Sequence, residues 1–212
     1  MPVYLLDESL WFPPVEEAMD DGLLAAGGDL STDRLLLAYS SGIFPWYNED
    51  EIPLWWSPDP RFVLFPAELK VSKSMVQLLK RPEFEFRVST AFSEVIQNCS
   101  QIKRKGEKGT WISGEIIDAY TKLHGLRYAY SAEAWHEGEL VGGLYGVLLC
   151  KVFFGESMFS FKSNASKYAF ICWVQLLKEE GIQLIDCQVY TPHLESLGAR
   201  MISRENFIKM LG

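Results

Sequence analysis

The sequence predicts an α/β protein with a mixed sheet, preceded by a small N-terminal domain. Three observations lead to this fold class. Residues 1–65 are rich in Pro, Gly and Trp, residues 128–160 read as three consecutive antiparallel strands, and the rest of the chain alternates helical and extended patterns. A meander followed by a helical crossover to another strand predicts three layers around a mixed sheet. We therefore divide the chain into residues 1–65 and a larger domain at 66–212.

The N-terminal domain contains one clear helix, from Asp33 to about Ser41. Ser31 or Thr32 caps it and Gly42 ends it. We expect the rest of this domain to be irregular backbone packed on its aromatic side chains.

The larger domain begins with helical patterns at 73–80, 91–101 and 114–124. The three antiparallel strands of 128–160 follow, with turns at 136–138 and 148–150. A long helix at 165–180 is capped by Ser163 or Asn164 and closed by Gly181. A strand at 182–189, a short helix at 192–197 and a last strand and helix complete the domain.

Composition limits the function. The net charge of −8 over 212 residues argues against broad non-specific nucleic-acid binding, although a local basic patch is compatible with it. The four cysteines form no C-x-x-C pair and the three histidines have no ligand spacing, so we predict no metal and no cofactor. The N-terminus has no secretory pattern and no apolar run reaches membrane-spanning length, so we expect a cytoplasmic protein without a membrane partner.

The stretch "LIDCQVYTPHLESLGA", residues 184–199, places polar groups at a predicted strand end. If 184–189 is extended, Asp186 and Gln188 project together and Cys187 points away. The two side chains could form a catalytic or binding pair, or they could stabilise the fold by capping the next helix.

A second polar strand end is "FFGESMFS", where alternation places Glu156, Met158 and Ser160 on one face. Pairing of this strand with 182–189 would bring Glu156 near Asp186. Two carboxylates without an obvious cation partner form an acidic site suited to a positively charged ligand. Alternatively, each carboxylate caps a helix or pairs with a surface lysine.

Apolar side chains could line a pocket whose mouth carries Glu156, Asp186 and Gln188. The candidates are Trp46, Trp111, Phe153, Met158, Phe170, Trp173 and Ile185. Each of them could equally be ordinary core.

Basic residues gather in two places on this acidic chain. "QIKRKGEKGTW" holds Lys103, Arg104, Lys105 and Lys108, and a second group, Lys70, Lys73, Lys80 and Arg81, flanks the 73–80 helix. Both are candidate phosphate contacts, or simply solvated residues.

The strand–helix–strand order suggests acetyl-coenzyme-A chemistry, which requires a Gly-rich turn that cradles the pyrophosphate. The junction here, "FSFKSNASKYAF", contains no glycine. We therefore predict no binding of coenzyme A.

Nine phrases occur in a fixed order: "LLAAGGDLS", "GIFPWY", "LWWSPDPRFVL", "GTWIS", "ELVGGLYGV", "GESMFS", "NASK", "LIDCQ" and "HLESLGA". Together they resemble the bacterial leucyl/phenylalanyl-tRNA–protein transferases, from about Phe12 to the C-terminus. The resemblance implies an acetyltransferase-like (GNAT-type) catalytic domain that binds aminoacyl-tRNA. It implies transfer of Leu or Phe, and Met less well, to proteins with N-terminal Arg or Lys, which marks them for N-terminus-dependent degradation.

The resemblance also assigns site residues by position. It implies a polar catalytic centre at Asp186, Gln188 and Glu156 and an aminoacyl pocket at the seven apolar candidates above. It implies tRNA contacts at Lys73, Lys80 and Arg81. We expect the enzyme to act as a monomer.

Two positions depart from the family pattern. Tyr130 stands where family members often have His, and Lys73 stands where Arg is common, which removes a bidentate phosphate fork. Three other functions compete with this interpretation: a tRNA-dependent enzyme that modifies a cell-wall precursor peptide, a coenzyme-A acetyltransferase, and a catalytically silent RNA-binding module.

Overall fold

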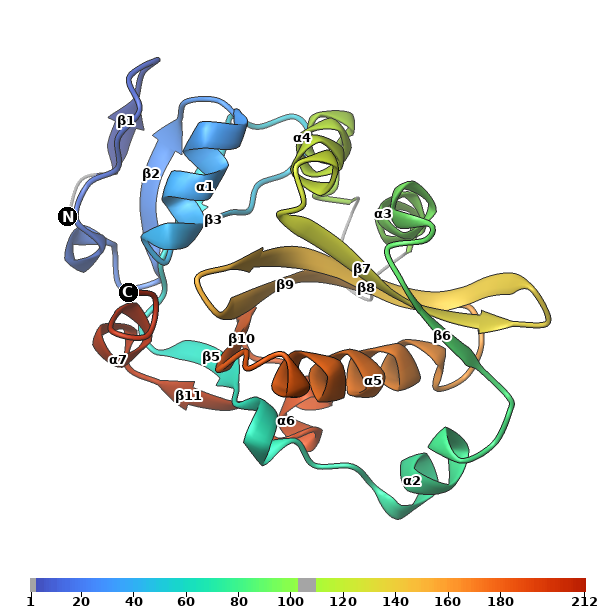
Figure 1. Cartoon of the computed structure of the whole chain (residues 1–212). Helices are drawn as coiled ribbons and strands as arrows, with labels where there is room; N and C mark the ends of the chain where they lie inside the picture. The colour runs from blue at the N-terminus through green and yellow to red at the C-terminus, as the bar shows by residue number, and fades with distance from the viewer. Residues whose placement is uncertain (1–2, 103–109) are drawn as a thin grey trace.

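The computed structural model describes residues 3–102 and 110–212, which form two β-sheets with surrounding helices (Figure 1). The strands are β1 (Tyr4–Leu6), β2 (Leu23–Gly27), β3 (Phe44–Pro45), β4 (Leu54–Trp56), β5 (Arg61–Leu64), β6 (Glu85–Val88), β7 (Ala129–His136), β8 (Glu139–Leu149), β9 (Val152–Ser160), β10 (Leu184–Gln188) and β11 (Arg200–Ile202). The helices are α1 (Thr32–Ser40), α2 (Lys73–Leu79), α3 (Phe92–Gln101), α4 (Gly114–Gly125), α5 (Ala165–Glu179), α6 (Pro192–Ser196) and α7 (Arg204–Ile208), with 3-10 turns η1 (Val15–Glu17) and η2 (Pro66–Glu68).

The larger sheet is mixed, and the predicted fold class is confirmed. Its strand order among the described residues is β11-β5-β10-β9-β8-β7-β6. β9 and β10 pair in parallel, while the other neighbours are antiparallel. α5 connects β9 to β10 and packs on one face, and α3 and α4 cover the other, which gives the predicted three layers (Figure 1).

Most helices of the described residues begin after a Ser or Thr cap, whereas α3 follows Ala91, which has no capping side chain. Serine hydroxyls cap α1, α2 and α4, each accepting a hydrogen bond from the backbone N–H three residues on. α5 differs, because its N-cap Asn164 has a left-handed backbone with φ 66° and its side chain makes no cap bond. Gly181, with φ 76°, follows the end of α5 as predicted.

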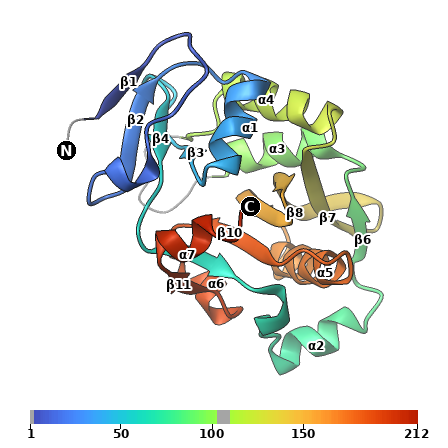
Figure 2. The same cartoon turned by 60° about the vertical axis from the view of Figure 1, so that its left-hand side comes forward.

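The prediction that the rest of the N-terminal segment is irregular is wrong. β1, β2, β4 and β3 form a second sheet, which lies with α1 beside α4 (Figures 1 and 2). Its strands have two to five residues and are separated by Gly and Pro, so they carry too little periodic signal to be recognised.

β5 lies between β10 and β11 in the larger sheet. The chain therefore enters this sheet at Arg61, before residue 65. The division of the chain at residue 65 stays a prediction.

One buried ion pair joins β5 to β10. Arg61 donates from Nε to Asp186 Oδ1 at 2.8 Å and from a terminal nitrogen to Oδ2 at 2.7 Å, and both residues are 0% exposed. The guanidinium lies between the rings of Phe44 and Phe207, 4.6 Å from each centroid. The pair thus connects β3 of the small sheet and α7 to the larger sheet.

We predict that Arg61→Met destabilises the protein strongly, because Asp186 would be left buried without its cation. Loss of one partner of a buried pair costs about 3–5 kcal/mol. Urea unfolding should show this loss, and Arg61→Met combined with Asp186→Leu should recover most of it.

The matched control is Arg200→Met, which removes a two-point ion pair to Glu68 on the surface. It should cost far less, because solvent screens exposed pairs. Equal losses for the two single variants would contradict the central role of the buried pair.

Candidate functional site

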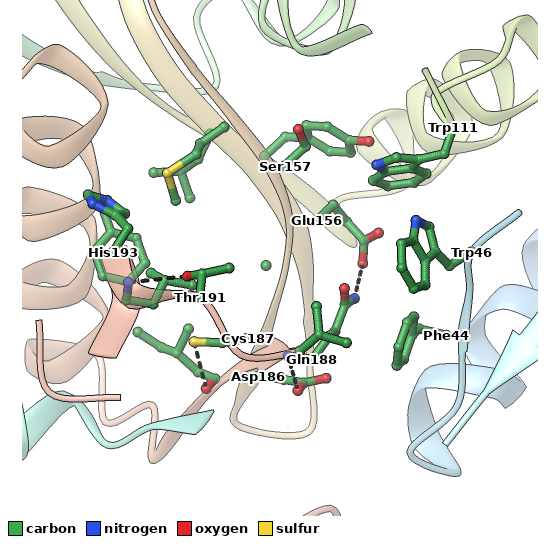
Figure 3. A pocket seen from close by; sticks show the side chains of 18 of the residues that line it. Phe44, Trp46, Trp111, Glu156, Ser157, Asp186, Cys187, Gln188, Thr191 and His193 are labelled. Carbon is green, nitrogen blue, oxygen red and sulfur yellow. Dashed lines mark hydrogen bonds between the residues drawn. The ribbon is translucent and has the colours of Figure 1, made fainter. Parts of the chain in front are cut away.

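The site lies where β9 and β10 separate. Their ladder covers three residues, Leu184–Asp186 paired with Val152–Phe154. A cavity of about 350 Å³ opens beside the end of this ladder (Figure 3). As predicted, Glu156, Asp186 and Gln188 all belong to its wall. The other lining residues are Phe44, Pro45, Trp46, Trp111, Leu144, Tyr145, Gly155, Ser157, Met158, Phe170, Ile185, Cys187, Val189, Thr191, His193 and Leu194.

A bulge in β9 orients Glu156. Tyr145 pairs with Ser157 and the next residue of β8, Gly146, pairs with Gly155, so Glu156 is the extra residue. Glu156 therefore turns toward α1 and α4, while Met158 packs on the α5 side. The prediction that these two side chains share a face is wrong, because the bulge reverses the alternation.

Gly146 permits this bulge. A Cβ at that position would lie 2.2 Å from the carbonyl oxygen of Phe154. No side chain fits there without moving the backbone of β9, so the close approach of the two strands requires glycine.

A second bulge, in β10, orients Gln188. The register against β5 shifts between Asp186 and Gln188, which leaves Cys187 as the extra residue. Gln188 adopts a left-handed backbone with φ 61°, and its N–H donates to Asp186 Oδ1 at 2.9 Å. Asp186 thus holds the backbone conformation that presents the Gln188 side chain.

Asp186 has a cation partner, contrary to the prediction. Arg61 binds both of its carboxylate oxygens, so the charge of Asp186 is compensated. The acidic character of the cavity therefore comes from Glu156.

Glu156 is the centre of a hydrogen-bond network. Its Oε1 accepts from Tyr39 at 2.7 Å and from Gln188 Nε2 at 3.1 Å, and its Oε2 accepts from Tyr120 at 3.2 Å (Figure 3 shows the bond to Gln188). The hydroxyls of Tyr39 and Tyr120 also bond to each other. Burial raises the pKa of Glu156 to about 7; the Asp186 charge adds to this rise, and the three hydrogen bonds oppose it.

The cavity has an aromatic mouth. Figure 3 shows Phe44, Trp46 and Trp111 in a row that faces Glu156 and Gln188. Trp46 is 42% exposed although its ring packs on Trp56, 5.9 Å away between centroids. An aromatic row beside a polar centre, with one ring open to solvent, suits a flat ring such as a nucleobase.

The other end of the cavity is apolar. Met158, Phe170 and Ile185 form it, and with Trp46 and Trp111 at the mouth, five of the seven predicted pocket residues line the cavity. Phe153 and Trp173 lie behind this wall, where they are buried and pack on each other with centroids 5.3 Å apart. Tyr130, which departs from the family pattern, packs near Trp173, with 6.3 Å between the ring centroids.

Several residues of the site were not predicted from the sequence, among them Tyr39, Tyr120, Arg61, Phe44 and His193. Tyr39 and Tyr120 lie among the apolar residues of α1 and α4, where a tyrosine is expected to pack as core, and Arg61 gives no signal because its partner is distant in the chain. His193 also lines the cavity, and burial lowers the pKa of its imidazole, as does the nearby charge of Lys167. The two tyrosines could have been found from one signal: a hydroxyl on the buried face of a helix needs a polar partner nearby.

The predicted tRNA contacts Lys73, Lys80 and Arg81 are exposed on and after α2. α2 packs beside α5 (Figure 1). The second basic group, Lys103, Arg104, Lys105 and Lys108, lies outside the described residues.

Residues 3–102 and 110–212 lack two features, a metal-binding cluster and a membrane-spanning helix. No group of three or more His, Cys, Asp or Glu side chains in this range could hold a metal ion. No helix in the same range is long and apolar enough to cross a membrane.

Comparisons with solved structures give partial overlaps. L-PGS from Bacillus licheniformis is 16% identical, with a TM-score of 0.43 over 82% of this chain and 57% of that one. A GCN5-related N-acetyltransferase from Kribbella flavida is 10% identical, with a TM-score of 0.38 over 78% and 58%. The assignment to a family rests on sequence instead.

Two family models match the chain. One, described as leucyl/phenylalanyl-tRNA protein transferase, covers residues 63–212, and the model of the N-terminal domain of the same proteins covers 28–59. A leucyl/phenylalanyl-tRNA–protein transferase from Syntrophobacter fumaroxidans is 57% identical over 100% of this chain and 90% of its own length. One from Flavobacterium johnsoniae is 57% identical over 99% of both. The chain belongs to the leucyl/phenylalanyl-tRNA–protein transferase family and is an aminoacyl-tRNA-dependent transferase.

Proposed function

We propose that this protein transfers Leu or Phe, and Met less well, from aminoacyl-tRNA to proteins that begin with Arg or Lys. The product carries a new N-terminal residue that marks the protein for degradation. The observation that carries the proposal is the composition of one cavity: an aromatic mouth, a polar centre of Glu156 and Gln188, and an apolar end. These parts suit a terminal adenosine, a reacting ester and an apolar amino-acid side chain. The enzyme acts as a monomer in the cytoplasm.

The chemistry asks for positioning more than activation, because the aminoacyl ester is already reactive. An α-amine has a pKa of about 7.7–8.0, so roughly a tenth is neutral at pH 7 and forming the free amine costs about 1 kcal/mol. Orientation can supply about 7–11 kcal/mol in well-aligned reactions.

Gln188 aligns the attacking amine. Its Nε2 donates to Glu156, which turns its carbonyl oxygen to accept from the amine. Asp186 acts on the amine through Gln188, since its own oxygens bind Arg61 and the Gln188 backbone. Glu156 supplies the negative charge that favours acceptors beginning with Arg or Lys.

The apolar end selects the donor. Met158, Phe170 and Ile185 surround the side chain of Leu or Phe, with Phe153 and Trp173 supporting them from behind. Missing bulk alone gives only about 1–3 kcal/mol of discrimination against Val, so rejection of β-branched side chains relies on shape. On the outside, Lys73, Lys80 and Arg81 contact the phosphates of the acceptor stem.

The deciding experiment uses Leu-tRNA with a radiolabelled leucyl group and two peptides that differ only in beginning with Arg or Ala. We expect label to move to the Arg peptide and not to the Ala peptide. Labelling of both would contradict the acceptor selectivity. Binding of intact Leu-tRNA with no transfer would instead support a silent RNA-binding module.

Met158→Ala should lower kcat/KM for Leu-tRNA by about tenfold or more, because it removes a contact with the donor side chain. The bulkier Phe should be affected less. Met201→Ala is the matched control, since Met201 is exposed on β11 outside the cavity. Unchanged selectivity between Leu and Phe would remove Met158 from the donor pocket.

Lys80→Gln with Arg81→Gln should weaken tRNA binding and reduce the slope of log K against log salt concentration by about one per lost phosphate contact. Lys209→Gln, directly after α7, is the control, because this lysine pairs with Glu205 of α7 at another end of the molecule from α2 (Figures 1 and 2). An unchanged salt slope would place the tRNA on a different face.

A further inference from the structure

The two carboxylates of the site differ in what they can reach. The Asp186 side chain is 0% exposed, whereas Glu156 keeps part of its surface open within the cavity wall. A group that exchanges a proton with a bound substrate must be reachable from the cavity. Both carboxylates belong to the cavity wall, but only Glu156 keeps exposed surface there, so Glu156 meets this criterion better than Asp186.

The hydrogen bonds of Asp186 also argue against a role as proton acceptor. Oδ1 accepts from Arg61 Nε and from the Gln188 N–H, and Oδ2 accepts from a terminal nitrogen of Arg61. A proton added to Asp186 would disrupt this pairing and leave the guanidinium buried without its anion. Both oxygens of Asp186 are thus occupied by framework contacts to Arg61 and the Gln188 N–H.

Glu156 can accept a further hydrogen bond. Oε1 accepts two bonds, from Tyr39 and Gln188, while Oε2 accepts one longer bond of 3.2 Å from Tyr120. A carboxylate oxygen can accept about two hydrogen bonds, so Oε2 has room for one more donor.

We propose that Glu156 accepts the proton released during peptide-bond formation, and that Arg61 is a positioning residue that acts through Asp186 to hold Gln188. This inference rests on the proposed transfer reaction and assigns the proton acceptor within it.

The step balances as follows. The neutral acceptor amine attacks the ester carbonyl carbon, a C–N bond forms, and the carbonyl π electrons move to oxygen. The positively charged nitrogen of the tetrahedral intermediate gives one proton to Glu156 Oε2. The C–O bond to the tRNA 3′ oxygen then breaks, and the proton of Glu156 goes to that leaving oxygen. The products are the amide and the tRNA 3′-hydroxyl, and Glu156 is ionised again.

The electrostatics of Glu156 support this role. The polar groups that face it are the Tyr39 hydroxyl from α1, the Tyr120 hydroxyl from α4, and Gln188 and the compensated Asp186 from β10. Burial raises the pKa of Glu156 to about 7. A base with a pKa close to the operating pH is well matched to take a proton and return it in the same cycle.

The test is the pH dependence of kcat for wild type, E156Q, D186N and R61K with saturating Leu-tRNA and Arg peptide, from about pH 5.5 to 8.5. In wild type we expect log kcat to fall at low pH with a limiting slope of two, from the acceptor amine and Glu156. E156Q should lower kcat about 10²–10⁴-fold and leave a slope of one. D186N and R61K should lower kcat and keep the slope of two, because they displace Gln188 without removing the base.

Y120F supplies a second measurement. It removes a hydrogen bond that stabilises ionised Glu156, so the Glu156 step should move to higher pH. Y190F is the control, since the Tyr190 hydroxyl bonds to Glu195 on the surface and should leave the step in place. Thermal unfolding of each variant checks the fold, and added formate should restore part of the activity of E156A.

A slope of two in E156Q, or loss of the second ionisation in D186N alone, would overturn the proposal. The proposed transfer would survive either result, because wild-type labelling of the Arg peptide tests it separately. Absence of transfer by wild type would remove both.

Discussion

The structure depends on one buried ion pair. Arg61 and Asp186 are distant in sequence, and their ion pair joins β5 to β10, two neighbouring antiparallel strands of the larger sheet. The guanidinium lies 4.6 Å from the ring centroids of Phe44 and Phe207, and both partners of the pair are 0% exposed. A charge in that position is tolerated only because its partner is fixed. The position of the β10 end that carries Asp186 and Gln188 follows from this constraint.

The site is built by irregularities in otherwise regular strands. A bulge in β9 turns Glu156 toward the tyrosines of α1 and α4, and a bulge in β10 sets the left-handed backbone of Gln188. Without them Glu156 and Met158 would share a face, and polar and apolar groups would mix. With them the polar centre and the apolar end of the cavity lie on opposite sides of the sheet.

Periodicity predicted the larger domain well, since its helices and its meander are long and regular. The convergence of Glu156, Asp186 and Gln188 also followed from strand order. Periodicity could not reveal the two β-bulges. Each inserts one extra residue into a strand and so changes the face to which the following side chains point, with no signal in the composition. Arg61 was missed because an ion pair across 125 positions leaves no local pattern. Tyr39 and Tyr120 were missed because a tyrosine on the inner face of a helix fits the apolar pattern. The hydrogen-bond partner of its hydroxyl is visible only in the structure.

The position of Arg61 has a consequence for the architecture. It lies between the segments that the two family models cover, residues 28–59 and 63–212, and it precedes the division at residue 65. A fragment that begins at residue 66 would keep Asp186 and lose the charge that compensates it, together with Tyr39 and Trp46. The two family models match separate segments of the chain, but the Arg61–Asp186 ion pair links residue 61 to the segment that follows it. Residues 1–65 therefore supply both the cation that balances Asp186 and part of the cavity wall around Glu156.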